Sequence, residues 1–142
     1  MKSTLIDGEN IIISDLFYTP KRNDIVVFHE NNSLNKPVVK RVIATEGETV
    51  NITYYDDTMR VKVTDVNGNS TVLEENYILY GHQKYFVSEK YTVPDNCVFV
   101  MGDNRNDSKD SRDPDVGFVD ERSILGKVIF RVTPFSKAGT VK

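Results

Sequence analysis

The feature that most constrains the fold is a series of short runs rich in β-branched and aromatic residues, most of them bounded by Gly, Pro, Asn or Asp. Such runs are typical of strands, because these side chains pack well on a pleated sheet. No segment keeps a helical period over three turns, and only Ser123–Leu125 is expected to form a short helical turn. The pattern predicts an all-β domain, a closed or coiled barrel. The expected strands are Ile11–Ile13, Ile25–Phe28, Val38–Ile43, Val50–Tyr55, Val61–Val66, Thr71–Leu73, Val98–Met101 and Val128–Val132.

Turn and loop signals organise these strands. With 142 residues, the chain is expected to form a single domain over residues 1–142. The segment Val66-Asn67-Gly68-Asn69 predicts a type I′ hairpin turn, since Asn-Gly readily takes positive φ angles. Long loops are expected near 30–36 and 103–117. The polar stretch from Asp56 to Tyr91 is interpreted as a small β insertion within the domain.

Composition excludes several functions. The net charge of −3 gives no reason to expect nucleic acid as a partner. Cys97 is the only cysteine, which excludes an intramolecular disulfide and a cysteine-rich zinc site. No apolar run approaches the ~20 residues that a membrane span requires, so the chain as written is expected to be soluble. We expect no cofactor.

Metal and histidine sites find little support. An EF-hand loop starting at Asp103 would need Asp or Asn, Gly and Glu where this chain has Arg105, Ser108 and Pro114, although a looser metal site stays open. His29 and His82 lie in no nucleophile motif such as Gly-x-Ser-x-Gly, so surface or structural roles are expected for them. No metal is predicted.

A lysine within an apolar strand is the first candidate for catalysis. Alternation along the strand puts Lys40 on one face with Val38 and Val42, and Arg41 on the other face. Burial disfavours the ammonium form and lowers the pKa of a lysine below its ordinary value of about 10.4. A neutral amine could then serve as a general base. The alternative is that both side chains extend from the strand into water.

The polar segment from Met101 to Arg112 is the second candidate. Its Gly, Asn, Asp and Ser residues favour turns closed by side-chain hydrogen bonds, and Arg112 can bind a carboxylate with two hydrogen bonds. A rigid polar loop could hold a catalytic group. A solvated surface loop is the alternative.

Four segments then follow one another in a characteristic order: Met1–Leu5, Asn23–Phe28, Lys40–Glu48 and Gly102–Arg112. Over nearly the whole chain this series resembles the type I signal peptidases. Their segments read Ser-Met-x-Pro-Thr-Leu, Gly-Asp-Ile-Val-Val-Phe, Lys-Arg-Val-Ile-Gly-x-Pro-Gly-Asp and Gly-Asp-Asn-x-x-x-Ser-x-Asp-Ser-Arg. The fourth segment matches at every family-defining position, whereas turn residues such as Asn23 and Ala44 replace glycines of the family.

The resemblance implies a Ser-Lys dyad peptidase that removes signal peptides from exported preproteins. It would act at the plasma membrane, with its catalytic domain on the extracytoplasmic side. Lys40 is implied as the general base and Ser108 as the residue that orients it, with Asp110 and Arg112 supporting the loop. A pocket for a small substrate side chain is implied near Met1, Leu5 and Val39.

The family's serine nucleophile immediately precedes the residue that aligns with Met1, and a membrane anchor lies further upstream. We therefore expect the nucleophile and the anchor to be missing from this chain and the chain as given to be inactive. Ser3 is a weaker alternative nucleophile, since the Thr4-Leu5 match puts it three residues too late. Two other hypotheses stay open: a LexA-type self-cleaving Ser-Lys domain and a non-enzymatic β-barrel that binds peptides.

Overall fold

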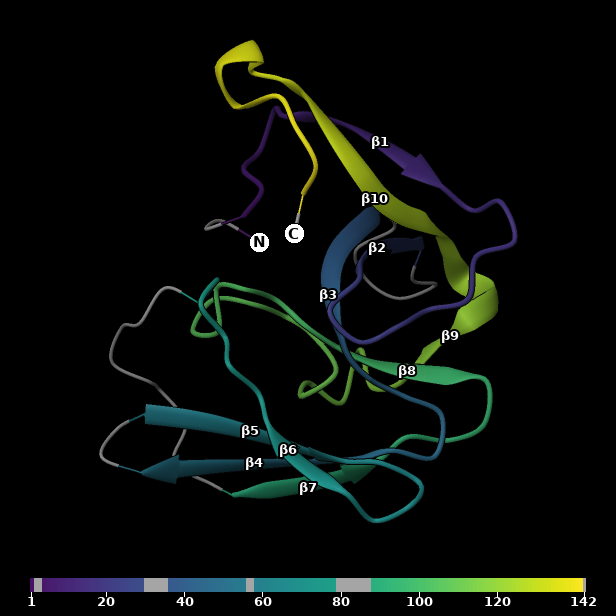
Figure 1. The fold of residues 1–142 in the computed structure, drawn as a ribbon, viewed down its shortest axis with the longest axis vertical. Helices are drawn as coiled ribbons and strands as arrows, with labels where there is room; N and C mark the ends of the chain where they lie inside the picture. The colour runs from purple at the N-terminus through teal and green to yellow at the C-terminus, as the bar shows by residue number, and fades with distance from the viewer. Residues whose placement is uncertain (2–3, 30–35, 56–57, 79–87, 142) are drawn as a thin grey trace.

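The computed structural model describes residues 1, 4–29, 36–55, 58–78 and 88–141, which form two antiparallel sheets (Figure 1). The Asp56 boundary, Ser3, His82 and most of the 30–36 loop lie outside the described residues. The all-β fold class is confirmed. The six-stranded sheet has the order β1 (Asn10–Ser14), β10 (Ile124–Thr133), β2 (Ile25–His29), β3 (Pro37–Thr45), β8 (Cys97–Met101) and β9 (Val119–Asp120). The four-stranded sheet has the order β6 (Ser70–Val72), β5 (Thr58–Thr64), β4 (Thr49–Tyr55) and β7 (Glu89–Thr92).

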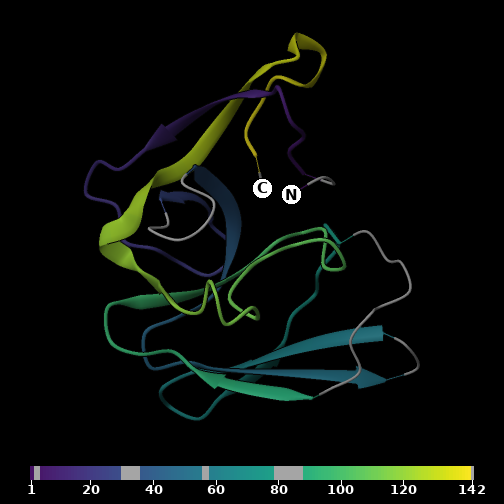
Figure 2. The same ribbon diagram turned by 180° about the vertical axis from the view of Figure 1, so that it is seen from behind.

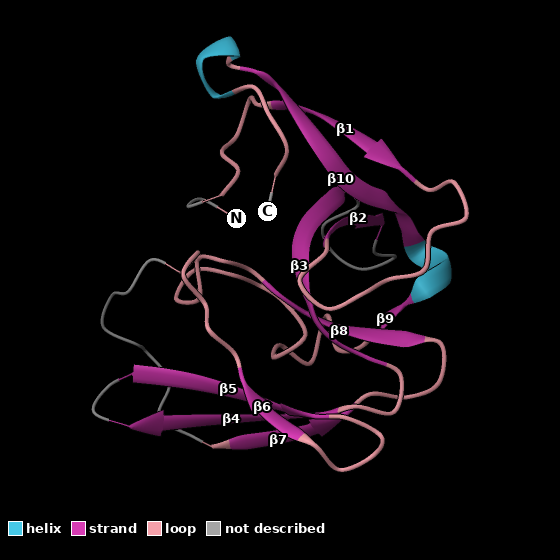
Figure 3. Cartoon of the chain, viewed as in Figure 1, coloured by secondary structure: helices cyan, strands magenta, loops and turns pink. Residues whose placement is uncertain are grey.

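The helical content is limited to two 3₁₀ turns in the described residues, η1 (Glu121–Ser123) and η2 (Phe135–Lys137), coloured cyan in Figure 3. The helical turn predicted at Ser123–Leu125 is wrong for its last two residues. The Asp120 side chain accepts a hydrogen bond from the Arg122 N–H, which starts the turn earlier, and β10 already begins at Ile124. Neither 3₁₀ turn is long or apolar enough to cross a membrane.

The β5–β6 connection falls where the sequence predicts a hairpin turn, but its type differs. Gly68 has a φ of 86°, while Asn67 does not have the positive φ that a type I′ turn requires. The Asp65 carboxylate accepts hydrogen bonds from the backbone N–H groups of Asn67 (2.9 Å) and Asn69 (2.8 Å). This side chain closes a wider turn that Asn-Gly alone does not predict.

Strands β3 and β8 lie at the centre of the molecule. Ile43 of β3, with Phe99 and Met101 of β8, belongs to a buried cluster shared with β4 and β5, which joins the two sheets. On the other side, Val42 packs with β2 and β9. Figures 1 and 2 show the long loop that follows β8 lying between the two sheets. The core therefore holds β3 and this loop side by side.

Candidate active site

Strand β3 carries two adjacent cations in different environments. Lys40 is half-buried and pairs across the sheet with Val26, whose side chain is fully buried. Arg41 is only 2% exposed. Alternation predicted that at least one cation would be flanked by apolar side chains, and the structure buries Arg41 deeply while Lys40 stays half-buried.

A buried carboxylate, Asp103, neutralises Arg41 and ties three segments together. Arg41 Nε donates to Asp103 Oδ1 at 3.0 Å and Arg41 Nη2 donates to Oδ2 at 2.9 Å. The Thr4 hydroxyl also donates to Asp103 Oδ2. The N-terminal segment, the Lys40 strand and the start of the Gly102–Arg112 loop therefore meet at one side chain. Sequence reasoning assigned no role to Asp103 or Thr4, although both lie in the matched segments.

The loop from Gly102 to Arg112 is closed by Asp110, which is fully buried. Its carboxylate accepts from the Gly102 backbone N–H at 2.9 Å and from Arg112 Nε and Nη2, each at 2.8 Å. Burial by itself raises the pKa of the Asp110 carboxyl, but the Arg112 guanidinium and the Gly102 N–H outweigh burial and hold that pKa below its ordinary value. These bonds give the loop the rigid form that its composition allows.

Ser108 packs directly on Gly102. A Cβ added to Gly102 would lie 2.1 Å from Ser108 Oγ, so only glycine leaves room for this serine. Ser108 Oγ is buried and has no hydrogen-bond partner among the described residues. It is near enough to help lower the pKa of Asp110, although the geometry between them is not that of a hydrogen bond. Ser108 Oγ therefore makes no hydrogen bond to Lys40 in the structure of the described residues.

The sheet register relates Ser108 to Lys40. Strands β3 and β8 are antiparallel, with Val42 opposite Val100 and Arg41 opposite Met101. The printed pairing ends at Arg41 and Met101, which are followed on the two strands by Lys40 and by Gly102, the residue on which Ser108 packs. The two polar candidates thus come to the same end of the β3–β8 pair.

The three apolar candidates also come together. Leu5 is buried in a cluster with Ile25, Val27 and Val128, and Met1 and Val39 pack against this cluster. Backbone N–H groups of Thr4 and Leu5 donate to the Met1 carbonyl at 2.8 and 2.7 Å, which folds the N-terminal segment into a turn. Met1, Leu5 and Val39 therefore belong to one apolar cluster, to which the Lys40 strand contributes Val39.

A cavity of about 560 Å³ borders the other side of the loop. Tyr54 and Glu89 of the four-stranded sheet line it together with Arg105, Ser108 and Arg112 of the loop. Lys40 does not line it. In the described residues, no group of three or more His, Cys, Asp or Glu side chains is arranged to hold a metal ion.

Comparisons with known proteins identify the family of this chain. The sequence model of the family "Signal peptidase, peptidase S26" matches residues 1–133. A signal peptidase I of Leptolyngbya laminosa is 36% identical over 98% of this chain and 67% of its own length. A signal peptidase I of Bacillus caldolyticus is 36% identical over 96% of this chain and 76% of its own length. The crystal structure of a signal peptidase I from Enterococcus faecalis superposes with a TM-score of 0.55 at 32% identity, covering 78% of this chain and 97% of that one. The chain belongs to the signal peptidase family, peptidase S26.

Proposed function

We propose that this chain removes N-terminal signal peptides from exported preproteins, with Lys40 as the general base of a Ser-Lys dyad. Family membership supports the reaction. The observation that supports the dyad is the β3–β8 pairing: it ends at Arg41 and Met101, next to Lys40 on one strand and to Gly102, on which Ser108 packs, on the other. We assign to Ser108 the role of orienting the Lys40 amine, because Ser108 packs on Gly102, which follows the β8 partner of Arg41.

The nucleophile in this proposal is a serine directly before Met1. The contact between Thr4 and Asp103, together with the turn closed on the Met1 carbonyl, would hold that position near the Lys40 strand. A neutral Lys40 would accept the serine's proton while the serine oxygen attacks the scissile carbonyl carbon. The protonated Lys40 would then give its proton to the leaving amine. Water would finally hydrolyse the acyl-enzyme, with Lys40 again as base.

The substrate residue before the scissile bond would contact the apolar surface of Met1, Leu5 and Val39. This surface adjoins a filled cluster of buried side chains, which favours a small apolar residue over a large one. Asp110 and Arg112 would act through Ser108, because their ion pair closes the loop that carries it.

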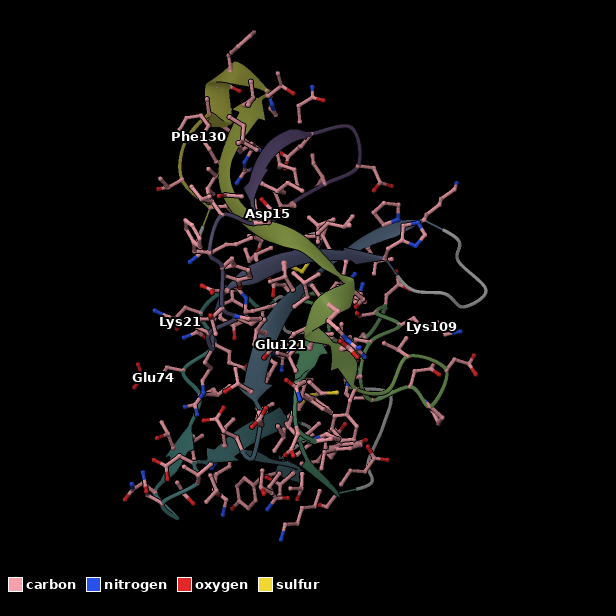
Figure 4. The ribbon with its side chains drawn as sticks, turned by 90° about the vertical axis from the view of Figure 1, so that its right-hand side faces the viewer. Asp15, Lys21, Glu74, Lys109, Glu121 and Phe130 are labelled. Carbon is pink, nitrogen blue, oxygen red and sulfur yellow. The ribbon has the colours of Figure 1, made fainter. Side chains whose placement is uncertain are left out.

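We propose that the enzyme acts at the extracytoplasmic face of the plasma membrane. Several large apolar side chains are exposed on or beside the β1–β10 pair, and Phe17 is 98% exposed. Because successive residues of a strand point to opposite faces, these side chains expose apolar area on both faces of the β1–β10 pair, where it could contact lipid. Figure 4 shows Phe130 near one end of the molecule, on β10. The group comprises Ile12, Ile13, Leu16, Phe17, Ile129, Phe130 and Phe135.

The test is peptide cleavage in trans by the chain carrying a serine directly before Met1, with an alanine at that position as the matched control. The substrate is a peptide with Ala-x-Ala before the scissile bond. We expect turnover with serine and none with alanine. Cleavage of the chain itself but not of the peptide would favour a LexA-type activity. Binding without cleavage in the serine form would favour a non-enzymatic peptide-binding domain.

A further inference from the structure

The segment from Leu73 to Ile78 connects the four-stranded sheet to the candidate active site. It follows β6 and runs toward the long loop after β8 (Figure 1). Two of its side chains turn inward: Glu75 is 6% exposed and Tyr77 is half-buried. Glu74 between β6 and Glu75 is exposed instead, and Figure 4 shows it at the outer edge of the molecule.

Glu75 neutralises a buried arginine of the loop. Arg105 is 2% exposed, and its Nη1 donates to Glu75 Oε2 at 3.0 Å while its Nη2 donates to Oε1. Arg105 Nε also donates to the Gly102 carbonyl at 3.1 Å. The Arg105 carbonyl in turn accepts from Arg112 Nη2 at 2.9 Å. Arg105 therefore holds both ends of the loop that carries Ser108, and Glu75 supplies its countercharge.

Tyr77 links this ion pair to the Lys40 strand. Its ring covers the Arg41 guanidinium at 3.8 Å from the ring centre, and its hydroxyl donates to Glu75 Oε1 at 3.0 Å. Burial and then the charge of Glu75 raise the pKa of the Tyr77 hydroxyl, so it stays protonated and remains a donor. Arg41 is the neighbour of Lys40 along β3. The segment from Leu73 to Ile78 thus contacts both Arg41, the neighbour of Lys40, and Arg105 of the loop that carries Ser108.

We propose that Glu75 and Tyr77 are positioning residues for the peptidase reaction, contributed by the segment that follows strand β6 of the four-stranded sheet. They hold the Ser108 loop against the Lys40 strand through Arg105 and Arg41. Neither residue touches the reacting atoms. This inference rests on the proposed function, because it takes Lys40 and Ser108 as the groups to be positioned. It also gives the Asp56–Tyr91 stretch a role in the reaction.

The first test compares Glu75→Gln with Glu74→Gln in the chain that carries a serine before Met1. Both variants lose one negative charge in adjacent residues, but only Glu75 contacts Arg105. Because small displacements of catalytic groups cost up to about 100-fold, we expect kcat per folded molecule to fall about 10- to 100-fold in Glu75→Gln. KM should stay within about twofold, since the apolar substrate surface is untouched, and Glu74→Gln should match the wild type. A merely structural role would lower the folded fraction, measured by circular dichroism, and leave kcat per folded molecule unchanged. That result would overturn the inference.

Tyr77→Phe keeps the test available if Glu75→Gln does not fold. It removes the hydroxyl that donates to Glu75 and keeps the ring over Arg41. We expect a smaller fall in kcat per folded molecule, again with little change in KM. Equal kcat in Tyr77→Phe and wild type would contradict the link through Glu75.

Hydrogen exchange supplies a measurement that needs no catalysis. Backbone amides of residues 103–112 should exchange faster in Glu75→Gln than in Glu74→Gln, because the loop loses the countercharge of Arg105. Equal exchange in the two variants would overturn the inference even if the enzyme is active. Conversely, absence of cleavage by the wild-type serine form would refute the proposed function, while faster loop exchange would still show that Glu75 holds the loop.

Discussion

The contact between Gly102 and Ser108 gives a sharp prediction for Gly102→Ala. The backbone itself tolerates alanine, since Gly102 is not among the residues with positive φ. The obstacle is the side chain of Ser108, whose Oγ and Cβ would lie 2.1 and 2.6 Å from the new Cβ. Real Cβ atoms do not approach so closely, so Ser108 or the whole loop has to move. Overpacking of this kind costs about 1–3 kcal/mol of unfolding free energy.

The control for this prediction is the same Gly102→Ala substitution made in a protein that also carries Ser108→Gly. Once the serine side chain is gone, the nearest remaining atom to the new Cβ is Asp110 Oδ2 at 3.8 Å, an ordinary contact. In that background Gly102→Ala should be neutral or slightly stabilising, by up to about 1 kcal/mol, because alanine restricts the unfolded chain. The two single variants and the double variant form a thermodynamic cycle that isolates the clash.

The assay is urea unfolding followed by far-ultraviolet circular dichroism, since the chain has no Trp to report by fluorescence. Peptide cleavage by the serine form should also fall sharply in Gly102→Ala, because the substitution displaces Ser108, the residue that we propose orients Lys40. An equal loss of stability from Gly102→Ala in both backgrounds would refute the reasoning, since the clash would then not involve Ser108.

Two further predictions concern ionisation. The lowered pKa of Asp110 means that its ion pair stabilises the fold above the ordinary carboxyl pKa of 3.8 and that this contribution is lost as pH falls through the folded-state value. Asp110→Asn should therefore lower the unfolding free energy by about 3–5 kcal/mol near pH 7, by leaving Arg112 without its countercharge, and the difference from wild type should shrink below about pH 4. The exposed Asp95→Asn is the control, and a difference that stays constant down to pH 2 would contradict the ion pair. Burial also raises the pKa values of four tyrosines, Tyr18, Tyr54, Tyr77 and Tyr91. An alkaline absorbance titration should therefore show them ionising at higher pH in the native protein than in the urea-unfolded chain. Coincident titration curves would argue against their burial.

The strands with β-branched runs could be predicted because their composition favours a pleated sheet whatever their neighbours are. Strand β7 (Glu89–Thr92) could not, since it is short and polar and forms by pairing with β4. The position of the β5–β6 turn was predictable from Asn67-Gly68, whereas its type depends on the Asp65 carboxylate. Local pattern thus locates elements better than it determines their geometry.

In the candidate site, too, some features could be predicted from the sequence and others could not. Alternation along β3 indicates that a cation is flanked by apolar residues, but it does not say that Arg41 is the more buried one. That outcome depends on Asp103 and Tyr77, which lie far away in the sequence and reach Arg41 only through the fold. The sequence did not indicate that Glu75 is buried or makes an ion pair, because a glutamate in a polar stretch is usually solvated. Its contact with Arg105 spans 30 positions and exists only once the two sheets are assembled.

The most direct test of the central claim is the loss of cleavage when Lys40 is removed. The comparison is Lys40→Ala against Lys90→Ala, an exposed lysine on β7, both in the chain with a serine before Met1 and both assayed on the Ala-x-Ala peptide. Removal of a general base costs about 100- to 10,000-fold in rate, so Lys40→Ala should fall by at least about 100-fold while Lys90→Ala retains wild-type activity. Cleavage by Lys40→Ala at the rate of Lys90→Ala would contradict the assignment of Lys40 as the base.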